Sequence, residues 1–233
     1  MLKISGLTSH YGSSQALFGV DLALGAGQVA TLLGRNGMGK TTTINAIMGI
    51  VPPSGGSISF DGVEISGLPS FRIARLGIGL VPEGRQIFPN LSMRENLIAT
   101  ASNHLGHPDP WTAERVYELF PELATRAGSM GNLLSGGEQQ MLAIGRALMT
   151  NPRLLILDEA TEGLAPMIRQ KIWAALKAIR ADGLSILVVD KNLSDLLKFA
   201  DVNFILARGK TVWSGGSEAL RADRSVLQRH LGV

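Results

Sequence analysis

Near the N-terminus, the residues Gly34-Arg35-Asn36-Gly37-Met38-Gly39-Lys40-Thr41 satisfy the pattern G-x-x-x-x-G-K-[ST], which is typical of a phosphate-binding loop. It lies between an apolar run at Gln28–Leu33 and a helical pattern at Thr41–Met48. Glycines allow successive backbone N–H groups to converge on a phosphate group. The positive end of the following helix faces the same anion. We therefore predict a phosphate-binding loop between a strand and a helix.

Outward from this loop, strand-like and helix-like segments alternate. Three strand-like runs are almost entirely apolar, as strands buried on both faces of a parallel sheet should be, and they are Val29–Leu33, Leu154–Leu157 and Ile186–Val189. Helical patterns follow them at Thr41–Met48, Met167–Ile179 and Leu193–Phe199. This alternation predicts an α/β fold.

The remaining segments predict two additions to that core. The strands Lys3–Leu7 and Ser57–Phe60, with turns at Ser54-Gly55-Gly56 and Asp61-Gly62, favour antiparallel hairpins. Further strands are expected at Gly79–Val81, Phe204–Leu206 and Thr211–Trp213. Helical patterns at Met93–Ala101 and Thr112–Phe120 indicate a small helical insertion. We expect one domain over 1–233, with a core of 1–89 and 136–233 and a helical subdomain at 90–135.

Composition excludes several classes of protein. The 233 residues contain no cysteine, which removes disulfides, thiol catalysis and cysteine-bound metals. The net charge is only +3 and no block of like charge occurs, so no nucleic-acid partner is expected. No run of 18 apolar residues and no signal-peptide pattern occurs, which predicts a chain without a membrane-spanning helix. Motifs of zinc proteases, of α/β-hydrolases and of GTPases are also missing from the sequence.

Two carboxylates follow a buried strand at Leu154-Leu155-Ile156-Leu157-Asp158-Glu159. Ligands bind α/β sheets at the carboxyl ends of their strands. Beside a phosphate loop, Asp158 and the Thr41 hydroxyl are candidate ligands of Mg²⁺, and Lys40 is expected to reach the β- and γ-phosphates. Glu159 is the candidate general base for a water molecule.

A second anion-binding turn is expected at Leu134-Ser135-Gly136-Gly137-Glu138-Gln139-Gln140. Ser135 and Glu138 have the spacing of a capping box, which explains these two residues as the start of a helix that runs to Met149. The paired glycines have no part in a capping box. An exposed helix N-terminus that follows two glycines can also bind an anion. The same turn can therefore cap the helix and bind an anion.

From Leu2 to about Gly216, these motifs together resemble the ATPase subunit of an ATP-binding-cassette (ABC) transporter. The resemblance implies a P-loop NTPase (RecA-like) α/β core with an N-terminal antiparallel β subdomain and an inserted helical subdomain. It also implies a pair of ATPases in which the Ser135 turn of one subunit contacts ATP held by the other. The residues expected to bind ATP are Tyr11, which would stack on adenine, the loop residues Arg35, Asn36, Gly37, Met38, Gly39, Lys40, Thr41 and Thr42, and the turn residues Ser135, Gly136, Gly137 and Glu138.

Two positions depart from the family pattern. Glu83, in Val81-Pro82-Glu83-Gly84-Arg85, stands where the family has a glutamine that contacts Mg²⁺ and couples to the membrane subunit. Lys191 stands where the family has a histidine near the γ-phosphate. A carboxylate can still bind Mg²⁺, and a lysine can pair with a phosphate but is charged at pH 7. The resemblance therefore assigns Glu83 to the metal site and Lys191 to catalysis.

Within the family, three stretches resemble the shorter ATPase of branched-chain amino-acid importers, and they are Val81–Pro89, Met141–Leu148 and Glu162–Pro166. The implied function is ATP hydrolysis with Mg²⁺ that energises import. The implied partners are a second ATPase subunit, permease subunits and, indirectly, a solute-binding protein, at the cytoplasmic side of a prokaryotic membrane. The alternatives are an ATPase for urea or another small polar solute, a clamp that binds ATP with little hydrolysis, and a soluble phosphotransferase.

Overall fold

The strand before the glycine loop, β3 (Val29–Leu33), is buried at every residue. In the computed structural model, which describes residues 1–232, β3 pairs in parallel with β8 (Ser185–Val189) and with β9 (Val202–Ala207). A strand with parallel neighbours on both sides is covered on both faces, which explains its apolar sequence. The predicted parallel arrangement of Val29–Leu33 and Ile186–Val189 is confirmed.

The internal contacts of the chain divide it into two units. The first consists of Met1–Ile73 with Ser185–Val233, and the second is Ala74–Leu184. The proposed division into a core of 1–89 and 136–233 and a helical subdomain at 90–135 stays a prediction.

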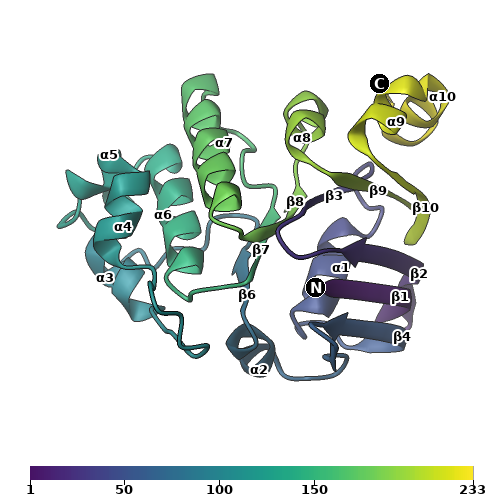
Figure 1. Ribbon diagram of the computed structural model, residues 1–233, viewed down its shortest axis with the longest axis horizontal. Coiled ribbons are helices and arrows are strands. Elements are labelled where there is room, and N and C mark those ends of the chain that lie inside the picture. Colours follow the sequence, from purple (N-terminus) through teal and green to yellow (C-terminus); the bar gives the residue numbers. More distant parts are fainter. Residues whose placement is uncertain (233) are drawn as a thin grey trace. The chain divides into compact units, whose positions relative to one another are not determined.

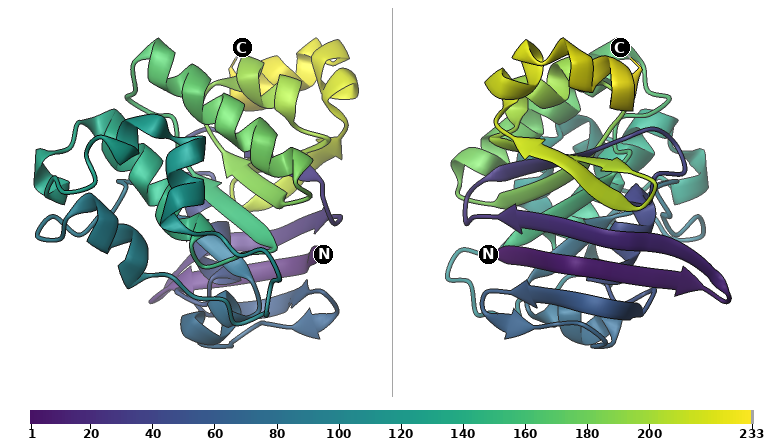
Figure 2. Two further views of the ribbon diagram at one scale, coloured as in Figure 1. Left: turned by 60° about the vertical axis from the view of Figure 1, so that its left-hand side comes forward. Right: turned by 90° about the vertical axis from the view of Figure 1, so that its right-hand side faces the viewer.

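The first unit is built on one sheet with the strand order β5-β4-β1-β2-β10-β9-β3-β8. Its other strands are β1 (Leu2–Tyr11), β2 (Ser14–Leu24), β4 (Pro53–Phe60), β5 (Val63–Glu64) and β10 (Lys210–Gly215). β1 pairs antiparallel with β2 and β4, and these strands lie side by side in Figures 1 and 2. The expectation of antiparallel strands near the N-terminus is therefore confirmed, as is the turn at Asp61-Gly62 between β4 and β5. The turn expected at Ser54-Gly55-Gly56 is wrong, because these residues lie within β4, where they pair with β1.

Strand β2 is an element that the sequence patterns do not predict. Leu17 and Val20 are both fully buried although they are three residues apart. Simple alternation would place them on opposite faces of the sheet. A register shift opposite Leu7 and Thr8, where Gly19 has a φ of 122°, brings both side chains to the same face. The bulge hides the period of two residues by which a strand is recognised.

The helices of the first unit follow its strands along the chain. They are α1 (Lys40–Ile47), α8 (Leu193–Phe199), α9 (Ser217–Ala222), α10 (Arg224–Val226) and a π-helical turn at Leu227–Leu231. The boundary between the two units falls within a further helix, α2 (Ser70–Arg75). α1 contacts β2, with Ile44 and Ile47 buried. The glycine loop is thus held between a fully buried strand and a helix that packs on the same sheet.

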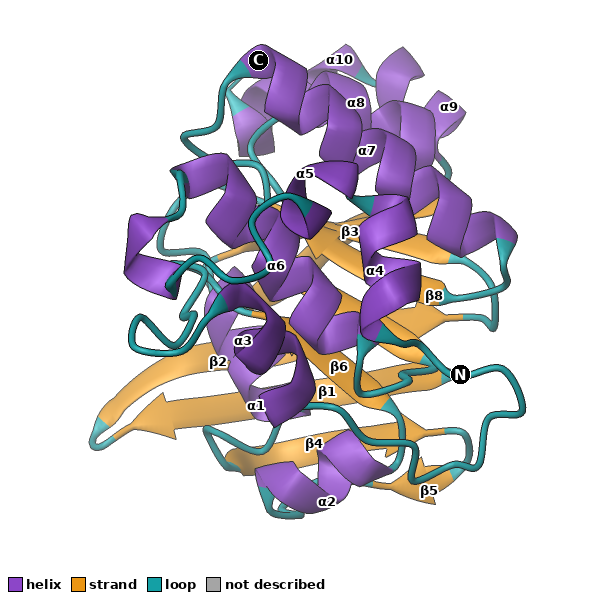
Figure 3. Cartoon of the chain, turned by 90° about the vertical axis from the view of Figure 1, so that its left-hand side faces the viewer, coloured by secondary structure: helices purple, strands orange, loops and turns teal. Residues whose placement is uncertain are grey.

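The second unit contains a parallel strand pair, β6 (Ile78–Val81) and β7 (Leu154–Asp158). Its helices are α3 (Met93–Ala99), α4 (Ala113–Leu119), α5 (Pro121–Ala124), α6 (Gly136–Leu148) and α7 (Pro166–Ala181). Figure 3 shows α3, α4 and α5 next to α6, which each of them contacts. The helices expected between 90 and 135 are therefore present. Among residues 1–232, no helix is long and apolar enough to cross a membrane.

Candidate functional site

The glycine loop requires glycine for steric reasons at two positions. Gly34 has a φ of 145°, and a Cβ atom there would lie 2.5 Å from the carbonyl oxygen of Leu206. Gly39 has a φ of 100°, and its Cβ would lie 2.7 Å from a methyl group of Leu17. Both conformations belong to a region that other residues rarely adopt. The loop is therefore wrapped closely against the backbone of β9 and the side chains of β2.

The turn between β9 and β10 supports the glycine loop from the other side. The N–H of Gly209 donates a hydrogen bond to the carbonyl oxygen of Met38 at 3.1 Å, and the N–H of Arg208 donates to the Met38 sulfur at 3.2 Å. Both turn residues have a positive φ. These bonds fix the middle of the loop, so its shape is set before any ligand binds.

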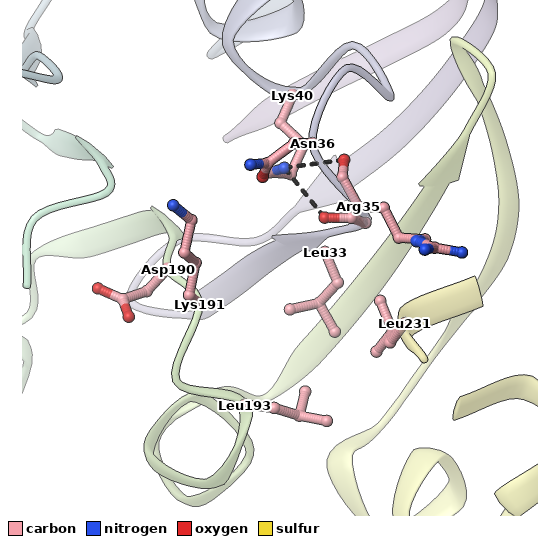
Figure 4. Close-up of a pocket in the computed structure, with 9 residues that line it drawn as sticks. Leu33, Arg35, Asn36, Lys40, Asp190, Lys191, Leu193 and Leu231 are labelled. Carbon is pink, nitrogen blue, oxygen red and sulfur yellow. Dashed lines mark hydrogen bonds between the residues drawn. The ribbon is translucent and has the colours of Figure 1, made fainter. Parts of the chain in front are cut away.

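The start of α1 has the features of an anion site. Gly39 is its N-cap residue, and within residues 1–232 no side chain caps the helix there. The first N–H groups of a helix have no partner within the helix, and the helix dipole makes this end positive. The Lys40 ammonium donates to the carbonyl oxygens of Gly34 (3.0 Å) and Arg35 (3.2 Å), as Figure 4 shows. Backbone amides and an ammonium group therefore converge on one loop, which fits a phosphate chain.

A pocket of about 410 Å³ opens beside this loop. It contains four of the predicted site residues, and its lining residues are Leu33, Gly34, Arg35, Asn36, Lys40, Asp190, Lys191, Leu193 and Leu231. Lys191 thus lines the same pocket as Lys40. The assignment of Lys191 to catalysis stays a prediction. Leu231 comes from the π-helical turn, and no pattern in the sequence connects it with the glycine loop.

The backbone on both sides of Lys191 is held by a local turn. The N–H of Asn192 donates to the Asp190 carboxylate at 2.9 Å, and the N–H of Leu193 donates to the carbonyl oxygen of Lys191 at 3.0 Å. Asn192 is also the N-cap of α8, where its side chain accepts from the N–H of Asp195. The position of Lys191 at the pocket is therefore determined by the end of β8 and the start of α8.

Tyr11 ends β1 in the first unit, and 51% of it is exposed. Its ring therefore has free surface on which an aromatic base could stack, which is compatible with the predicted role. Stacking of Tyr11 on adenine stays a prediction.

In the second unit, β7 ends at Asp158, and Glu159, the second carboxylate predicted for the site, directly follows it. Asp158 is buried, with 3% of its surface exposed, and Glu159 follows with a φ of 54°. A positive φ at a residue other than glycine is uncommon, and residues in such strained conformations cluster at functional sites. The turn continues with a hydrogen bond from the N–H of Glu162 to the carbonyl oxygen of Glu159 at 3.3 Å. The conformation of Glu159 supports its assignment as a functional residue.

The second predicted turn forms a complete capping box at the start of α6. The N–H of Ser135 donates to the Glu138 carboxylate at 2.7 Å, and the N–H of Glu138 donates to the Ser135 hydroxyl at 3.3 Å. Burial acts to raise the pKa of Glu138, but the hydrogen bonds from Ser135 and from Arg126 outweigh it, so this pKa lies below its usual range. Glu138 is therefore ionised at neutral pH and favourably placed at the positive end of the helix.

The remaining predicted residues lie in the same segments. Gly37, Thr41 and Thr42 belong to the loop and first turn of α1 in the first unit, whereas Glu83 is exposed in the loop after β6 in the second. Mg²⁺ prefers oxygen ligands and is usually bound through one or two carboxylates together with the phosphates of a substrate. The hydroxyl of Thr41 and the carboxylates of Asp158 and Glu83 have the chemistry of such ligands. That these three residues hold Mg²⁺ stays a prediction.

Comparison with known proteins agrees with these features. The sequence model of the family described as ABC transporter matches residues 17–162. The chain is 39% identical to the high-affinity branched-chain amino acid transport ATP-binding protein BraG of Pseudomonas aeruginosa, over the whole length of both proteins. It is 34% identical to the lipopolysaccharide export system ATP-binding protein LptB of Escherichia coli, which covers 99% of this chain and 97% of LptB.

Solved structures show the same fold. A nucleotide-free ATP-binding cassette from an ABC transporter has a TM-score of 0.85 and 26% identity, and the match covers 98% of this chain and 97% of that one. The ATP-binding cassette MJ0796, solved as a dimer in a post-hydrolysis state with ADP and Pi, has a TM-score of 0.78 and 25% identity, with coverages of 93% and 99%. Together with the glycine loop and the capped turn, these similarities show that the chain belongs to the ABC transporter family and is a nucleotide-binding ATPase subunit of that family.

Proposed function

We propose that this subunit hydrolyses ATP to energise the import of branched-chain amino acids. The observation that carries the proposal is the 39% identity to BraG over the whole of both chains. The identity to the export protein LptB is lower, at 34%. In such transporters, other subunits select the solute. The proposed solute class therefore rests on the similarity of this chain to BraG and not on a residue of this chain that touches the solute.

In the proposed reaction, the loop amides and Lys40 hold the β- and γ-phosphates of ATP. The Glu159 carboxylate accepts a proton from a water molecule whose oxygen bonds to the γ-phosphorus. The bond between this phosphorus and the bridging oxygen of the β-phosphate breaks, which releases ADP and phosphate. Mg²⁺, held by Thr41, Asp158 and Glu83, would neutralise negative charge on the phosphates. Tyr11 stacks on the adenine ring.

We further propose that two ATPase subunits act as a pair. MJ0796, which has the same fold, was solved as a dimer with ADP and Pi. In the proposed pair, the turn at Ser135, Gly136, Gly137 and Glu138 meets the γ-phosphate of ATP held by the partner, and its N-terminal helix dipole favours that anion. The pair would work at the cytoplasmic face of a prokaryotic membrane, with permease subunits and a solute-binding protein.

Transport by the assembled complex tests the proposed function. The complex that copurifies with this chain from its native membrane is reconstituted into vesicles, and uptake of labelled leucine, isoleucine and valine is measured with and without ATP. We expect uptake of these amino acids that depends on ATP and on the solute-binding protein. Uptake of urea alone, or ATP-dependent transport of a lipid in the outward direction, would contradict the proposal.

A second candidate, an ATP-dependent clamp with little hydrolysis, is favoured by one observation, the lysine at position 191. Lys191 lines the pocket beside the glycine loop together with Lys40. A lysine side chain ordinarily carries a positive charge at pH 7, where a histidine is mostly neutral, and a positive charge favours bound ATP. The clamp would bind ATP in a pair of subunits and release it slowly.

Replacing Lys191 distinguishes hydrolysis from clamping. If Lys191 stabilises the transition state, Lys191→Met should lower kcat of the assembled complex by about 10- to 150-fold, the value of one charge-assisted hydrogen bond. Lys191→His should retain most of the rate, and Lys198→Met, at an exposed lysine on α8, is the matched control. Negligible hydrolysis by the wild-type complex, together with a clear gain in Lys191→His, would establish the clamp instead.

A further inference from the structure

The loop that follows β6 lies against α6, the helix that begins at the Ser135 turn. Its backbone turns sharply, since Arg85 and Gln86 both have a positive φ, of 65° and 47°. The N–H of Gln86 donates to the carbonyl oxygen of Gly84 at 2.7 Å. The tight turn directs the side chain of Arg85 to the start of α6.

The guanidinium group of Arg85 lies directly on Gly136. A Cβ atom on Gly136 would be 2.9 Å from both terminal nitrogens of Arg85 and 3.1 Å from its Cζ atom. Nη1 of Arg85 donates to the Gln139 side-chain oxygen at 3.3 Å, and the Gln139 amide donates to the carbonyl oxygen of Gly131 at 3.3 Å. Arg85 thus connects the loop to the first turn of α6 and to the turn that precedes it.

The same loop is also held by the opposite end of α6. Arg146, in the last turn of the helix, donates to the carbonyl oxygen of Gln86 at 2.7 Å. Its guanidinium carbon lies 4.2 Å from the ring centre of Phe88. Arg85 reaches from the loop to the helix, and Arg146 reaches from the helix to the loop. A movement of the loop relative to α6 would therefore change both contacts.

The stability of α6 does not explain why the positively charged Arg85 lies beside the N-terminus of this helix. Cations are unfavourable near the N-terminus of a helix, because this end carries the positive pole of its dipole. The nearby Glu138 carboxylate already accepts from Ser135 and Arg126. The charge of Arg85 becomes favourable when an anion approaches the turn.

We propose that Arg85 is a positioning residue for ATP hydrolysis, which holds Gly136 and the neighbouring Ser135 where the γ-phosphate of the partner subunit's ATP must bind. This inference rests on the proposed pair of subunits. Arg85 acts through the backbone of the turn, and its charge is oriented by the contact with Gln139. The nucleotide held by the chain's own glycine loop does not depend on it.

The kinetic constants of variants in the assembled complex test this role. Arg85→Ala should lower kcat by about tenfold or more, while KM and the affinity of the isolated chain for ATP stay within about twofold. Arg85→Lys should recover only part of the rate, because lysine keeps the charge but lacks the planar group that lies on Gly136. Arg94→Ala, at an exposed arginine on α3, is the matched control and should leave both constants unchanged.

A double-mutant cycle with Gly136→Ala isolates the contact. In the wild type, the new methyl group obliges the guanidinium group of Arg85 to shift away from the turn, so Gly136→Ala should lower kcat to about the level of Arg85→Ala. In the Arg85→Ala background the space is open, and the same substitution should cost clearly less. Thermal unfolding of each variant identifies any that fail to fold. If Arg85→Ala fails to fold, the cycle is measured with Arg85→Lys in its place.

Several results would overturn the inference. An unchanged kcat in Arg85→Ala, equal losses of kcat and of ATP affinity in the isolated chain, or strict additivity in the cycle would each contradict it while the wild type still hydrolyses ATP. Absence of hydrolysis by the wild-type complex would instead remove the proposed function, and the role of Arg85 with it.

Discussion

Glu159→Gln is expected to slow ATP hydrolysis by about 10²- to 10⁴-fold while ATP remains bound, because glutamine keeps the shape of the side chain but accepts no proton from water. Glu159 follows the buried end of β7 with a φ of 54°, a conformation that costs free energy and that the turn nevertheless maintains. The variant is tested by phosphate release under saturating MgATP and by equilibrium binding of ATP. Because bound ATP is no longer consumed, we also expect the variant to accumulate as a pair of subunits in the presence of ATP.

The matched control for Glu159 is Glu118→Gln, at an exposed glutamate on α4 in the same unit. It removes the same charge and should leave the rate unchanged. Near-normal hydrolysis in Glu159→Gln would show that another group accepts the proton, and the assignment of Glu159 would be wrong.

Lys40→Ala is expected to abolish productive binding of ATP. The Lys40 ammonium lies at the centre of the glycine loop, bonded to the carbonyl oxygens of Gly34 and Arg35. Bound to ATP, it would contact two phosphates, and each charge-assisted hydrogen bond contributes about 1.5–3 kcal/mol. The dissociation constant of ATP should therefore rise by about 10²-fold or more, as measured by calorimetry or with a fluorescent nucleotide.

Lys3→Ala provides the control for Lys40, because Lys3 is exposed on β1 in the same unit. Its ATP affinity should equal that of the wild type. Retention of wild-type affinity in Lys40→Ala, with a correctly folded protein, would place the phosphates away from the glycine loop.

The parts of the fold that the sequence predicts are those with local causes. Val29–Leu33 and Leu154–Leu157 are apolar because both faces of their strands are covered, and the loop after the first needs its glycines for steric reasons at Gly34 and Gly39. The capping box at Ser135 and Glu138 is visible from a spacing of three residues. In each case, residues close together in the sequence are sufficient to predict the structural element.

The parts that the sequence does not predict depend on contacts between distant residues. Arg85 and Gly136 are 51 positions apart in the sequence, and only the folded chain shows that a guanidinium group covers this glycine. Leu231 likewise reaches the pocket of Lys40 through the π-helical turn near the end of the described chain. Strand β2 was hidden by a bulge at Gly19, because a single extra residue reverses the alternation.

The decisive measurement is phosphate release from MgATP by the assembled wild-type complex, compared with release by complexes that carry Glu159→Gln or Lys40→Ala. We expect continuous release by the wild type and loss of release in both variants, with ATP still bound in Glu159→Gln and no longer bound in Lys40→Ala. Release that continues in both variants would contradict the claim that the glycine loop and the acid after β7 together hydrolyse ATP.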